Sequence, residues 1–285
     1  MEASREFDGA AMLLPRRIRD RMLFLDGDLR SRAEEIRLRG GRGASVVTAS
    51  GTVALDIAVT RADIEETLDN AVCSSMHSAA DSIRRGFVTA PGGYRIGICG
   101  SVVIKAGEKS GIRNVSSLCI RIPRMCRCAD ERIIKAAGEA SLLVASPPAG
   151  GKTTLIRDIV RRLSDGGSRV ALVDERGELA AMNEGIPQLD VGKNTDVLEN
   201  CPKNDAVELL LRSMNPQYIA MDELGGREDM EAVRRASGCG VRLIAGIHCP
   251  SREKLAAADM PPGIFERVVF IERKGGEREY RMEEL

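Results

Sequence analysis

The segment SLLVASPPAGGKTTLIRDIV, residues 141–160, constrains the fold more than any other part of the chain. Its apolar run ends at Ala145, a short loop of Pro, Ala and Gly follows, and a helical pattern opens at Lys152. In a strand, loop and helix of this kind, backbone N–H groups surround a phosphate and the helix N-terminus adds its dipole. The segment therefore predicts a phosphate-binding loop formed by Ser146, Pro147, Pro148, Ala149, Gly150, Gly151, Lys152, Thr153 and Thr154.

Two side chains of this loop predict ATP and Mg²⁺ as its ligands. Lys152 would reach the β- and γ-phosphates, and we expect it to point to solvent until nucleotide arrives. The Thr153 hydroxyl would ligate Mg²⁺. The pattern GxxxxGK[ST] places its first glycine at position 146, where this chain has Ser146. A serine must make the turn with a Cβ, so we expect the loop to form and phosphate affinity to suffer.

A second acidic segment, NPQYIAMDELGG, ends an apolar run in Asp222 and Glu223. An aspartate at this point can hold Mg²⁺, and the adjacent glutamate can polarise the attacking water as general base. The alternative is that both acids only end a strand. With a phosphate loop about 70 residues earlier, the pattern favours Asp222 for the metal and Glu223 for the water.

Two further strand ends carry polar side chains. VALVDERGEL places Glu175 and Glu178 after a strand, and LIAGIHCP places His248 after the next one. Parallel strands present their carboxyl ends at one edge of a sheet, where ligands of open α/β sheets bind. All four elements are therefore expected to meet in one crevice, with Glu175, Glu178 and His248 as further catalytic candidates. His248 would sense the γ-phosphate, although a lone histidine at a strand end can also be structural.

The rest of the chain predicts two domains. Residues 1–130 are predicted to be α+β, with a helix over 10–25, a helix from Thr60 to 85, several strands, and a loop over 106–114. Residues 131–285 alternate strands with helices and end in a hairpin around 274–277, as in an α/β domain with a parallel sheet.

Composition excludes several classes of protein. The net charge is zero, with an excess of four basic residues in 1–130 and of four acidic residues in 131–285. Together with the lack of Trp and only eight Tyr and Phe, this argues against a nucleic-acid binder. No apolar run could span a bilayer and no secretory signal is evident, so we expect a cytoplasmic protein. The eight cysteines include no CxxC pair and are expected to be reduced thiols.

The four elements, in this order, resemble the ATPases of bacterial type II and type IV secretion systems. EEIRLR, GFVTAPGGYRIGICGSVV, GGKTTLIRDIVR, LVDERGEL and MDELGGREDMEAV further resemble the stage III sporulation protein AA family across residues 30–275. The resemblance implies a RecA-like P-loop ATPase domain after a smaller α+β domain. It also implies a hexameric ring, a membrane protein of the same operon as partner, and a mother-cell location. There it would energise a channel between mother cell and forespore.

Two alternatives stay open: a RecA-like ATPase that acts on nucleic acid, and an ATP-binding scaffold with little turnover. Phosphoryl transfer also needs positive charge beyond one lysine. Ring ATPases commonly obtain it from an arginine, in the same subunit or a neighbour. IRNVSSLCIRIPR offers Arg113, Arg121 and Arg124. These could equally belong to a solvated face of a sheet.

Overall fold

The computed structural model describes residues 4–285 except 73–79, 106, 124–126, 257–259 and 275–276. The chain forms two compact units. The first contains residues 1–124 and 181–188, and the second contains 125–180 and 189–285. The predicted boundary at residue 130 lies a few residues after the division between 124 and 125 in the structure. The prediction of two contiguous domains also placed residues 181–188 in the second domain, whereas they pack with the first unit.

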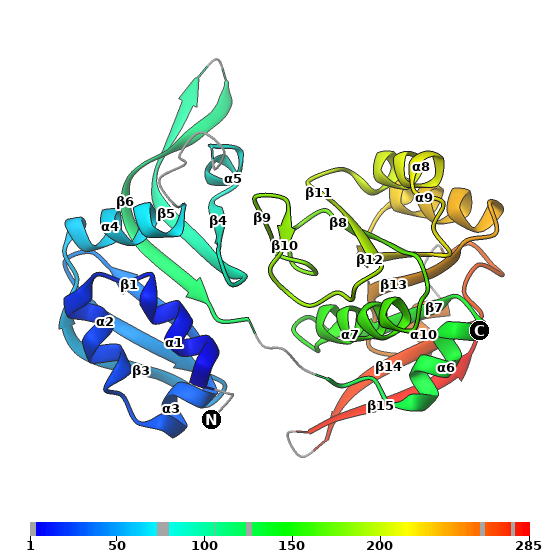
Figure 1. Cartoon of the computed structure of the whole chain (residues 1–285), viewed down its shortest axis with the longest axis horizontal. Coiled ribbons are helices and arrows are strands. Elements are labelled where there is room, and N and C mark those ends of the chain that lie inside the picture. The colour runs from blue at the N-terminus through cyan, green and yellow to red at the C-terminus, as the bar shows by residue number, and fades with distance from the viewer. Residues whose placement is uncertain (1–3, 73–79, 106, 124–126, 257–259, 275–276) are drawn as a thin grey trace. The chain divides into compact units, whose positions relative to one another are not determined.

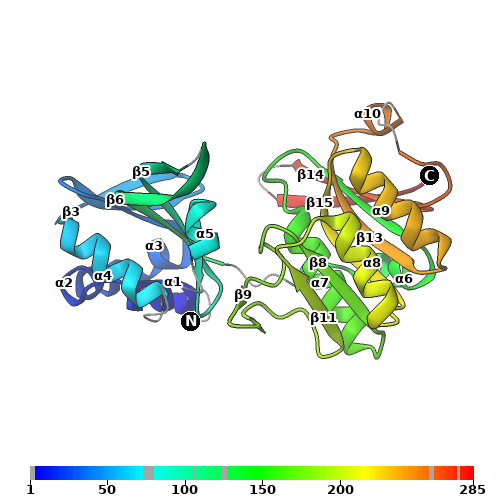
Figure 2. The same ribbon diagram turned by 90° about the horizontal axis from the view of Figure 1, so that it is seen from above.

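The first unit is an antiparallel sheet with helices on one face (Figure 2). Its strand order is β3-β2-β1-β6-β5-β4. The elements are α1 Arg5–Met12, α2 Arg16–Leu23, α3 Gly27–Arg32, β1 Ala33–Arg39, β2 Gly43–Thr48, β3 Gly51–Ala58, α4 Arg61–Ala71, α5 Ala80–Arg84, β4 Phe87–Ala90, β5 Tyr94–Lys105 and β6 Glu108–Arg121. Along β1, Ile36 and Leu38 are buried while Arg37 and Arg39 point to the opposite face, as the period of a strand requires.

The predicted N-terminal helix is wrong as a single element. The structure has α1 and α2 instead, with Pro15 at the N-cap of α2. Proline lacks an N–H and its ring clashes with the preceding turn, so a continuous helix cannot pass through it. The start predicted at Thr60 is confirmed, because Thr60 and Asp63 form a capping box at α4. That helix ends at Ala71, and part of its predicted extension, 73–79, lies outside the described residues.

The predicted loop over 106–114 is also wrong, because β6 already begins at Glu108. Ser101 faces Arg113 and Val102 faces Ile112, so β5 and β6 continue as a two-stranded ribbon. Cross-strand pairs of β-branched side chains stabilise such a ribbon, and they outweigh the Gly and Lys content that suggested a loop.

The second unit is a seven-stranded sheet between two layers of helices (Figure 1). The order is β11-β8-β12-β13-β7-β14-β15, parallel except for β15. Its elements are α6 Glu131–Glu139, β7 Leu142–Ser146, α7 Lys152–Asp165, β8 Val170–Asp174, β11 Thr195–Glu199, α8 Lys203–Ser213, β12 Tyr218–Leu224, α9 Arg227–Gly238, β13 Arg242–His248, α10 Arg252–Ala256, β14 Arg267–Lys274 and β15 Glu277–Glu284. Helices α8 and α9 pack on one face, while α6 and α7 cover the other.

The register of the parallel strands positions the site. His248 of β13 faces Ser146 of β7, and Met221 of β12 faces Val173 of β8. The carboxyl ends of all four strands therefore lie at one edge, as the sequence predicts. Among the described residues, no helix is both long and apolar enough to cross a membrane.

The segment between β8 and β11 leaves the second unit and returns to it. It contains β9 Met182–Asn183 and β10 Ile186–Pro187, a short hairpin that the sequence analysis did not predict. Asn183 donates its side-chain amide to the Thr89 carbonyl oxygen at 2.9 Å, and Gln188 Oε1 accepts from the Gly92 N–H at 2.8 Å. Two-residue strands leave too short a pattern to be recognised.

Candidate nucleotide-binding site

The loop between β7 and α7 has the backbone of an anion cradle. Its left-handed residues are Ala149, at φ 57°, and Gly151, at φ 108°, directly before the helix. Ser146 is buried and is not among the left-handed residues, and its hydroxyl donates to the Pro147 carbonyl at 2.8 Å. The strain expected at Ser146 therefore falls on Ala149, where a left-handed conformation costs about 1–2 kcal/mol.

Gly150 is the residue that makes room for this serine. A Cβ at position 150 would lie 2.4 Å from Ser146 Oγ and 2.7 Å from Ser146 Cβ. Such separations are far below van der Waals contact, so position 150 must lack a side chain while position 146 carries one. The serine at 146 and the glycine at 150 form one steric unit. Pro147, Pro148 and Ala149 are exposed at the tip of the loop, and Thr154 is half-buried in the first turn of α7.

Lys152 does not point to solvent, so that prediction is wrong. The residue is only 6% exposed, and its Nζ lies 2.7 Å from Nδ1 of His248. Burial lowers the pKa of Lys152, while the charges of Glu223 and Asp222 act in the opposite direction. A partly desolvated ammonium next to the loop is suited to a phosphate, because a phosphate anion would offset the loss of hydration of the charged group.

Thr153 and Asp222, the two residues that the sequence predicts as Mg²⁺ ligands, are in contact with each other. The Thr153 hydroxyl donates to Asp222 Oδ1 at 2.9 Å. Asp222 is 7% exposed, and burial raises the pKa of its carboxyl, with Thr153 lowering it and the nearby charge of Glu178 raising it. Mg²⁺ takes few protein ligands and prefers hard oxygens beside substrate phosphates, so this hydroxyl and carboxylate fit the ion.

A bulge in β12 sets the direction of Asp222 and Glu223. Met221 faces Ala245 and Leu224 faces Ile247, so an extra residue of β12 is accommodated between them. A bulge of this kind re-aims side chains next to active sites. Gly246 of β13 allows it, since a Cβ there would lie 2.0 Å from the Asp222 carbonyl oxygen.

Two nitrogen groups from different strand ends lie next to the carboxylate of Glu223. Arg176 Nη1 donates to Glu223 Oε2 at 3.2 Å, and His248 Nε2 lies 3.2 Å from the same oxygen. His248 therefore lies between Lys152 and Glu223, with one ring nitrogen next to each. With Nδ1 accepting from the ammonium, the proton of the neutral ring lies on Nε2, next to the carboxylate.

The loop after β8 is shaped by Asp174. Its fully buried carboxylate accepts three backbone N–H groups, from Glu178, Leu179 and Ala180, at 2.8–3.0 Å. From α7, Arg157 donates to the carbonyl oxygens of Glu178 and Leu179, both at 2.6 Å. Burial lowers the pKa of Arg157, and the charge of Asp174 offsets part of that effect. The loop is thereby fixed to the same helix that begins at the phosphate cradle.

The two predicted catalytic acids of this loop lie in different surroundings. Glu175 pairs with the buried Lys203 at 2.5 Å, and Lys203 also approaches Asp229 at 3.5 Å. Asp229 in turn accepts the Gly225 N–H. Glu178 is half-buried and close enough to Asp222 for its charge to raise the pKa of that carboxyl. The charge of Glu178 therefore acts on Asp222, whereas Glu175 is engaged in an ion pair.

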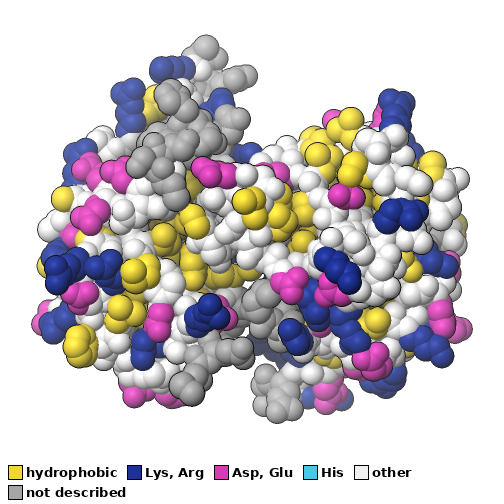
Figure 3. All heavy atoms as spheres, viewed as in Figure 1, with side chains coloured by type: hydrophobic (Ala, Val, Ile, Leu, Met, Phe, Trp, Pro, Cys, Tyr) yellow, Lys and Arg dark blue, Asp and Glu magenta, His cyan; other side chains and the backbone are white. Residues whose placement is uncertain are grey.

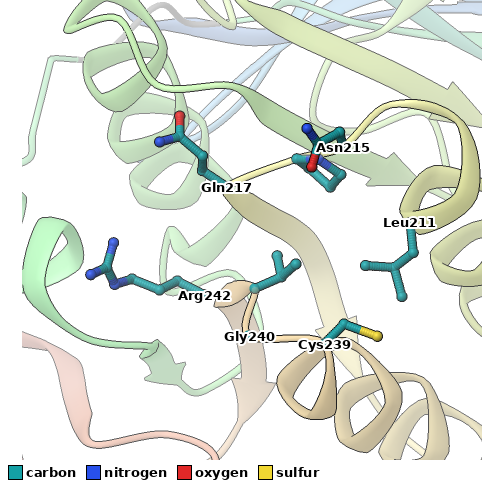
Figure 4. Close-up of a pocket in the computed structure, with 8 residues that line it drawn as sticks. Leu211, Asn215, Gln217, Cys239, Gly240 and Arg242 are labelled. Atoms are coloured by element: carbon teal, nitrogen blue, oxygen red, sulfur yellow. The ribbon is translucent and has the colours of Figure 1, made fainter.

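A cavity of about 460 Å³ lies at the opposite edge of the sheet, where β12 and β13 begin (Figure 4). Gln217 and Arg242 line one end of it, and Leu211 and Cys239 line the other. Arg242 is engaged there, because it donates to the Tyr218 hydroxyl at 3.2 Å and lies over its ring. Ligands of open parallel sheets bind at the carboxyl edge, so the phosphate loop is the candidate site.

The sequence analysis missed four residues that organise this edge: Arg157, Arg176, Lys203 and Gly246. Arg157 and Lys203 each lie on an amphipathic helix, where a basic residue is normally predicted to face solvent. Arg176 lies between Glu175 and Glu178 in the acidic segment. A basic residue among acids at the end of a strand is the one signal in the sequence that could have indicated an ion pair there.

Two solved structures share the fold. The ATPase DotB of Legionella pneumophila is 15% identical, with a TM-score of 0.58 over 89% of this chain and 75% of that one. The pilus retraction motor PilT with bound ADP is 16% identical, with a TM-score of 0.62 over 89% and 79%. The fold is therefore a RecA-like α/β domain that follows a smaller α+β domain, as predicted.

Sequence comparison shows the family. The family described as "Sporulation stage III, protein AA" matches residues 8–281. Stage III sporulation protein AA of Bacillus subtilis (strain 168) is 34% identical over 223 residues, 75% of this chain and 73% of the relative. Protein SEEDLING PLASTID DEVELOPMENT 1 of Arabidopsis thaliana is 32% identical over 114 residues, 39% of this chain and 16% of that protein. The chain therefore belongs to the stage III sporulation protein AA family.

Proposed function

We propose that the protein binds Mg-ATP at the edge formed by β7, β8, β12 and β13 and hydrolyses it to ADP and phosphate. The observation that carries this proposal is that two sets of contacts lie at this edge. Lys152 Nζ lies 2.7 Å from His248 Nδ1, whose ring lies 3.2 Å from Glu223. Thr153 and Asp222, the neighbours of Lys152 and Glu223 in sequence, are joined by a hydrogen bond of 2.9 Å. Each group has the chemistry that its place requires: a cation for phosphate, oxygens for Mg²⁺, and a carboxylate for the water.

In the proposed reaction, Lys152 leaves His248 for the β- and γ-phosphates, and Thr153 and Asp222 hold Mg²⁺. A Mg²⁺ ion held by these two residues would supply positive charge next to the phosphates. Glu223 would accept a proton from the attacking water through its carboxylate. His248, whose Nδ1 the lysine vacates, would sense the γ-phosphate through that change. The charge of Glu178 acts on Asp222, and its carboxylate would orient water on the ion.

The biological role that we propose follows from the family. The protein would work as a ring, proposed to be a hexamer, on the cytoplasmic face of the mother-cell membrane. It would energise assembly of, or transport through, a channel to the forespore. A membrane protein of the same operon would be its docking partner. The fold shared with DotB, an ATPase, and with PilT, a pilus retraction motor, supports an ATP-driven task.

An arginine from the first unit would supply the remaining positive charge in such a ring. Arg121 of β6 is 62% exposed and lies directly opposite Arg95 of β5, on the sheet face away from the helices. Arg113 is exposed on the ribbon, and Arg124 lies outside the described residues. Glu35 approaches Arg121 at 3.9 Å. The alternative is therefore that these arginines lie on a solvent-exposed face of the sheet and take no part in hydrolysis.

Steady-state ATP turnover at rising protein concentration tests the proposal. We expect turnover per chain to increase with concentration, because each site would be complete only in an assembly. Replacing Arg113, Arg121 or Arg124 singly by Ala should lower turnover at one or two positions without weakening ATP binding. Turnover that is absent in a protein that still binds ATP would favour the scaffold.

Stimulation by DNA in the same assay would favour the nucleic-acid alternative. Figure 3 shows basic and acidic side chains interspersed over the face in view, and such mixing gives no extended basic surface on that face. Affinity for DNA depends on neutralising several phosphates together, so we expect no change in turnover on its addition.

A further inference from the structure

We propose that Arg176 is a positioning residue that holds the catalytic carboxylate of Glu223. The inference rests on the proposed function, in which Glu223 is the general base. Arg176 Nη1 lies 3.2 Å from Glu223 Oε2, the same oxygen that faces His248 Nε2. Among the described contacts of Glu223, the hydrogen bond from Arg176 and the approach of His248 are both at Oε2, which leaves Oε1 to accept the proton of the attacking water.

Glu223 needs such support because of where it lies. It lies within the bulge of β12, between Met221 and Leu224, so the regular ladder does not fix the direction of its side chain. The carboxylate is 23% exposed, and a glutamate has three rotatable bonds. The 3.2 Å approach of His248 would by itself allow the carboxylate to rotate, whereas the hydrogen bond that Arg176 donates from another strand end restricts this rotation. Two anchors at one oxygen define where the other oxygen points.

The loop that carries Arg176 is rigid enough to serve as an anchor. Asp174 and Arg157 bind the backbone of residues 178–180 and 178–179, immediately after it. The Gly177 N–H donates to the Asp174 carbonyl at 3.2 Å, and Gly177 has φ 65°. The arginine side chain thus projects from a turn that is tied to both β8 and α7. A donor on a fixed backbone positions a carboxylate better than one on a free loop.

The pair between Arg176 and Glu223 is a poor candidate for a stabilising contact. Arg176 is 58% exposed, and exposed ion pairs contribute little to stability because water screens them. The same pair can have a large effect on the rate, since a displacement of about 1 Å near reacting atoms can lower a rate about 100-fold. Loss of the arginine should therefore lower kcat while the fold and ATP binding persist.

The experiment is a double-mutant cycle read in single-turnover ATP hydrolysis, with ATP affinity from calorimetry. Arg176→Ala should lower the hydrolysis rate about 10- to 100-fold, with ATP affinity within twofold of wild type. Arg176→Lys, which retains one cationic donor, should recover part of the rate. In a Glu223→Gln background, Arg176→Ala should cause no further loss, because the residue acts through that carboxylate. Arg234→Ala, an exposed arginine of α9, is the matched control and should leave the rate unchanged.

Each other outcome contradicts the proposal. A wild-type rate in Arg176→Ala, with Glu223→Gln inactive, would show that the base needs no second anchor while the proposed function survives. A loss of ATP affinity in Arg176→Ala would make Arg176 a phosphate ligand. An additional loss in the Glu223→Gln background would show that it acts independently of the carboxylate. Normal hydrolysis by Glu223→Gln would instead contradict the proposed function itself.

Discussion

Asp174 and Asp222 are buried aspartates at the ends of neighbouring strands, β8 and β12, yet their carboxylates have different partners. Asp174 accepts three backbone N–H groups of its own loop. Asp222 accepts one hydroxyl, from Thr153, and lies among other carboxylates that raise its pKa. The hydrogen-bonding capacity of the Asp174 carboxylate is met by its own loop, which is typical of a structural residue. The carboxylate of Asp222 has one donor among the described residues and lies near other negative charges, so a cation bound there would be favourable, which is typical of a metal ligand.

The largest expected effect concerns the base. Glu223→Gln keeps the size of the side chain and loses its basicity, so hydrolysis should fall about 10²–10⁴-fold while Mg-ATP still binds. Glu178→Gln, on the loop organised by Asp174, is the matched comparison and should have a smaller effect. Phosphate release under saturating ATP measures both. If Glu223→Gln hydrolyses normally and Glu178→Gln or Glu175→Gln abolishes turnover, the base lies in the β8 loop.

Asp174→Asn should destabilise the protein. The amide would present an NH₂ group where the aspartate accepts backbone N–H groups, and a buried donor left facing donors costs about 1–3 kcal/mol. We expect the free energy of unfolding in urea to fall by that amount. An unchanged urea midpoint would mean that the loop is held without Asp174, chiefly by Arg157.

Asp222→Asn should raise the free energy of unfolding of the ligand-free protein, the opposite of the effect expected for Asp174→Asn. Burial raises the pKa of Asp222, so the carboxylate is less favourable in the folded than in the unfolded state. The folded state therefore binds a proton more tightly, and stability is lost as the pH rises through the unfolded and then the folded pKa. A neutral amide should remove this cost and raise stability at neutral pH by about 1 kcal/mol, at the expense of Mg-ATP binding.

Thermal unfolding without nucleotide, at pH 7, compares Asp222→Asn with Asp174→Asn directly. A higher melting temperature for the first and a lower one for the second support the distinction between them. Destabilisation by Asp222→Asn would place Asp222 with Asp174 as a structural residue, and the assignment of Mg²⁺ to this carboxylate would lose its physical basis.

The smallest expected effect is that of Glu175→Gln. Glu175 pairs with Lys203, which keeps Asp229 as a second partner. The free energy of unfolding should fall by about 1 kcal/mol or less, and hydrolysis should stay within twofold of wild type. A drop in hydrolysis of tenfold or more would return Glu175 to the catalytic group.

The sequence predicted the strand ends well, because short apolar runs followed by Lys152, Asp222 and His248 are local patterns. It could not predict which acid faces which cation. The pair Lys203–Glu175 joins residues 28 apart, and the contact between Lys152 and His248 joins residues 96 apart. The bulge in β12 likewise depends on Gly246 in another strand. Such features follow from register and packing, which no local pattern contains.

The central claim is that the carboxyl edge of this sheet is a nucleotide site built around Lys152. Calorimetric titration of ATP in the presence of Mg²⁺ into wild type and Lys152→Ala tests it most directly. We expect wild type to bind and Lys152→Ala to lose measurable binding while its circular dichroism spectrum and melting transition remain those of a folded protein. Unchanged ATP affinity in folded Lys152→Ala would contradict the claim.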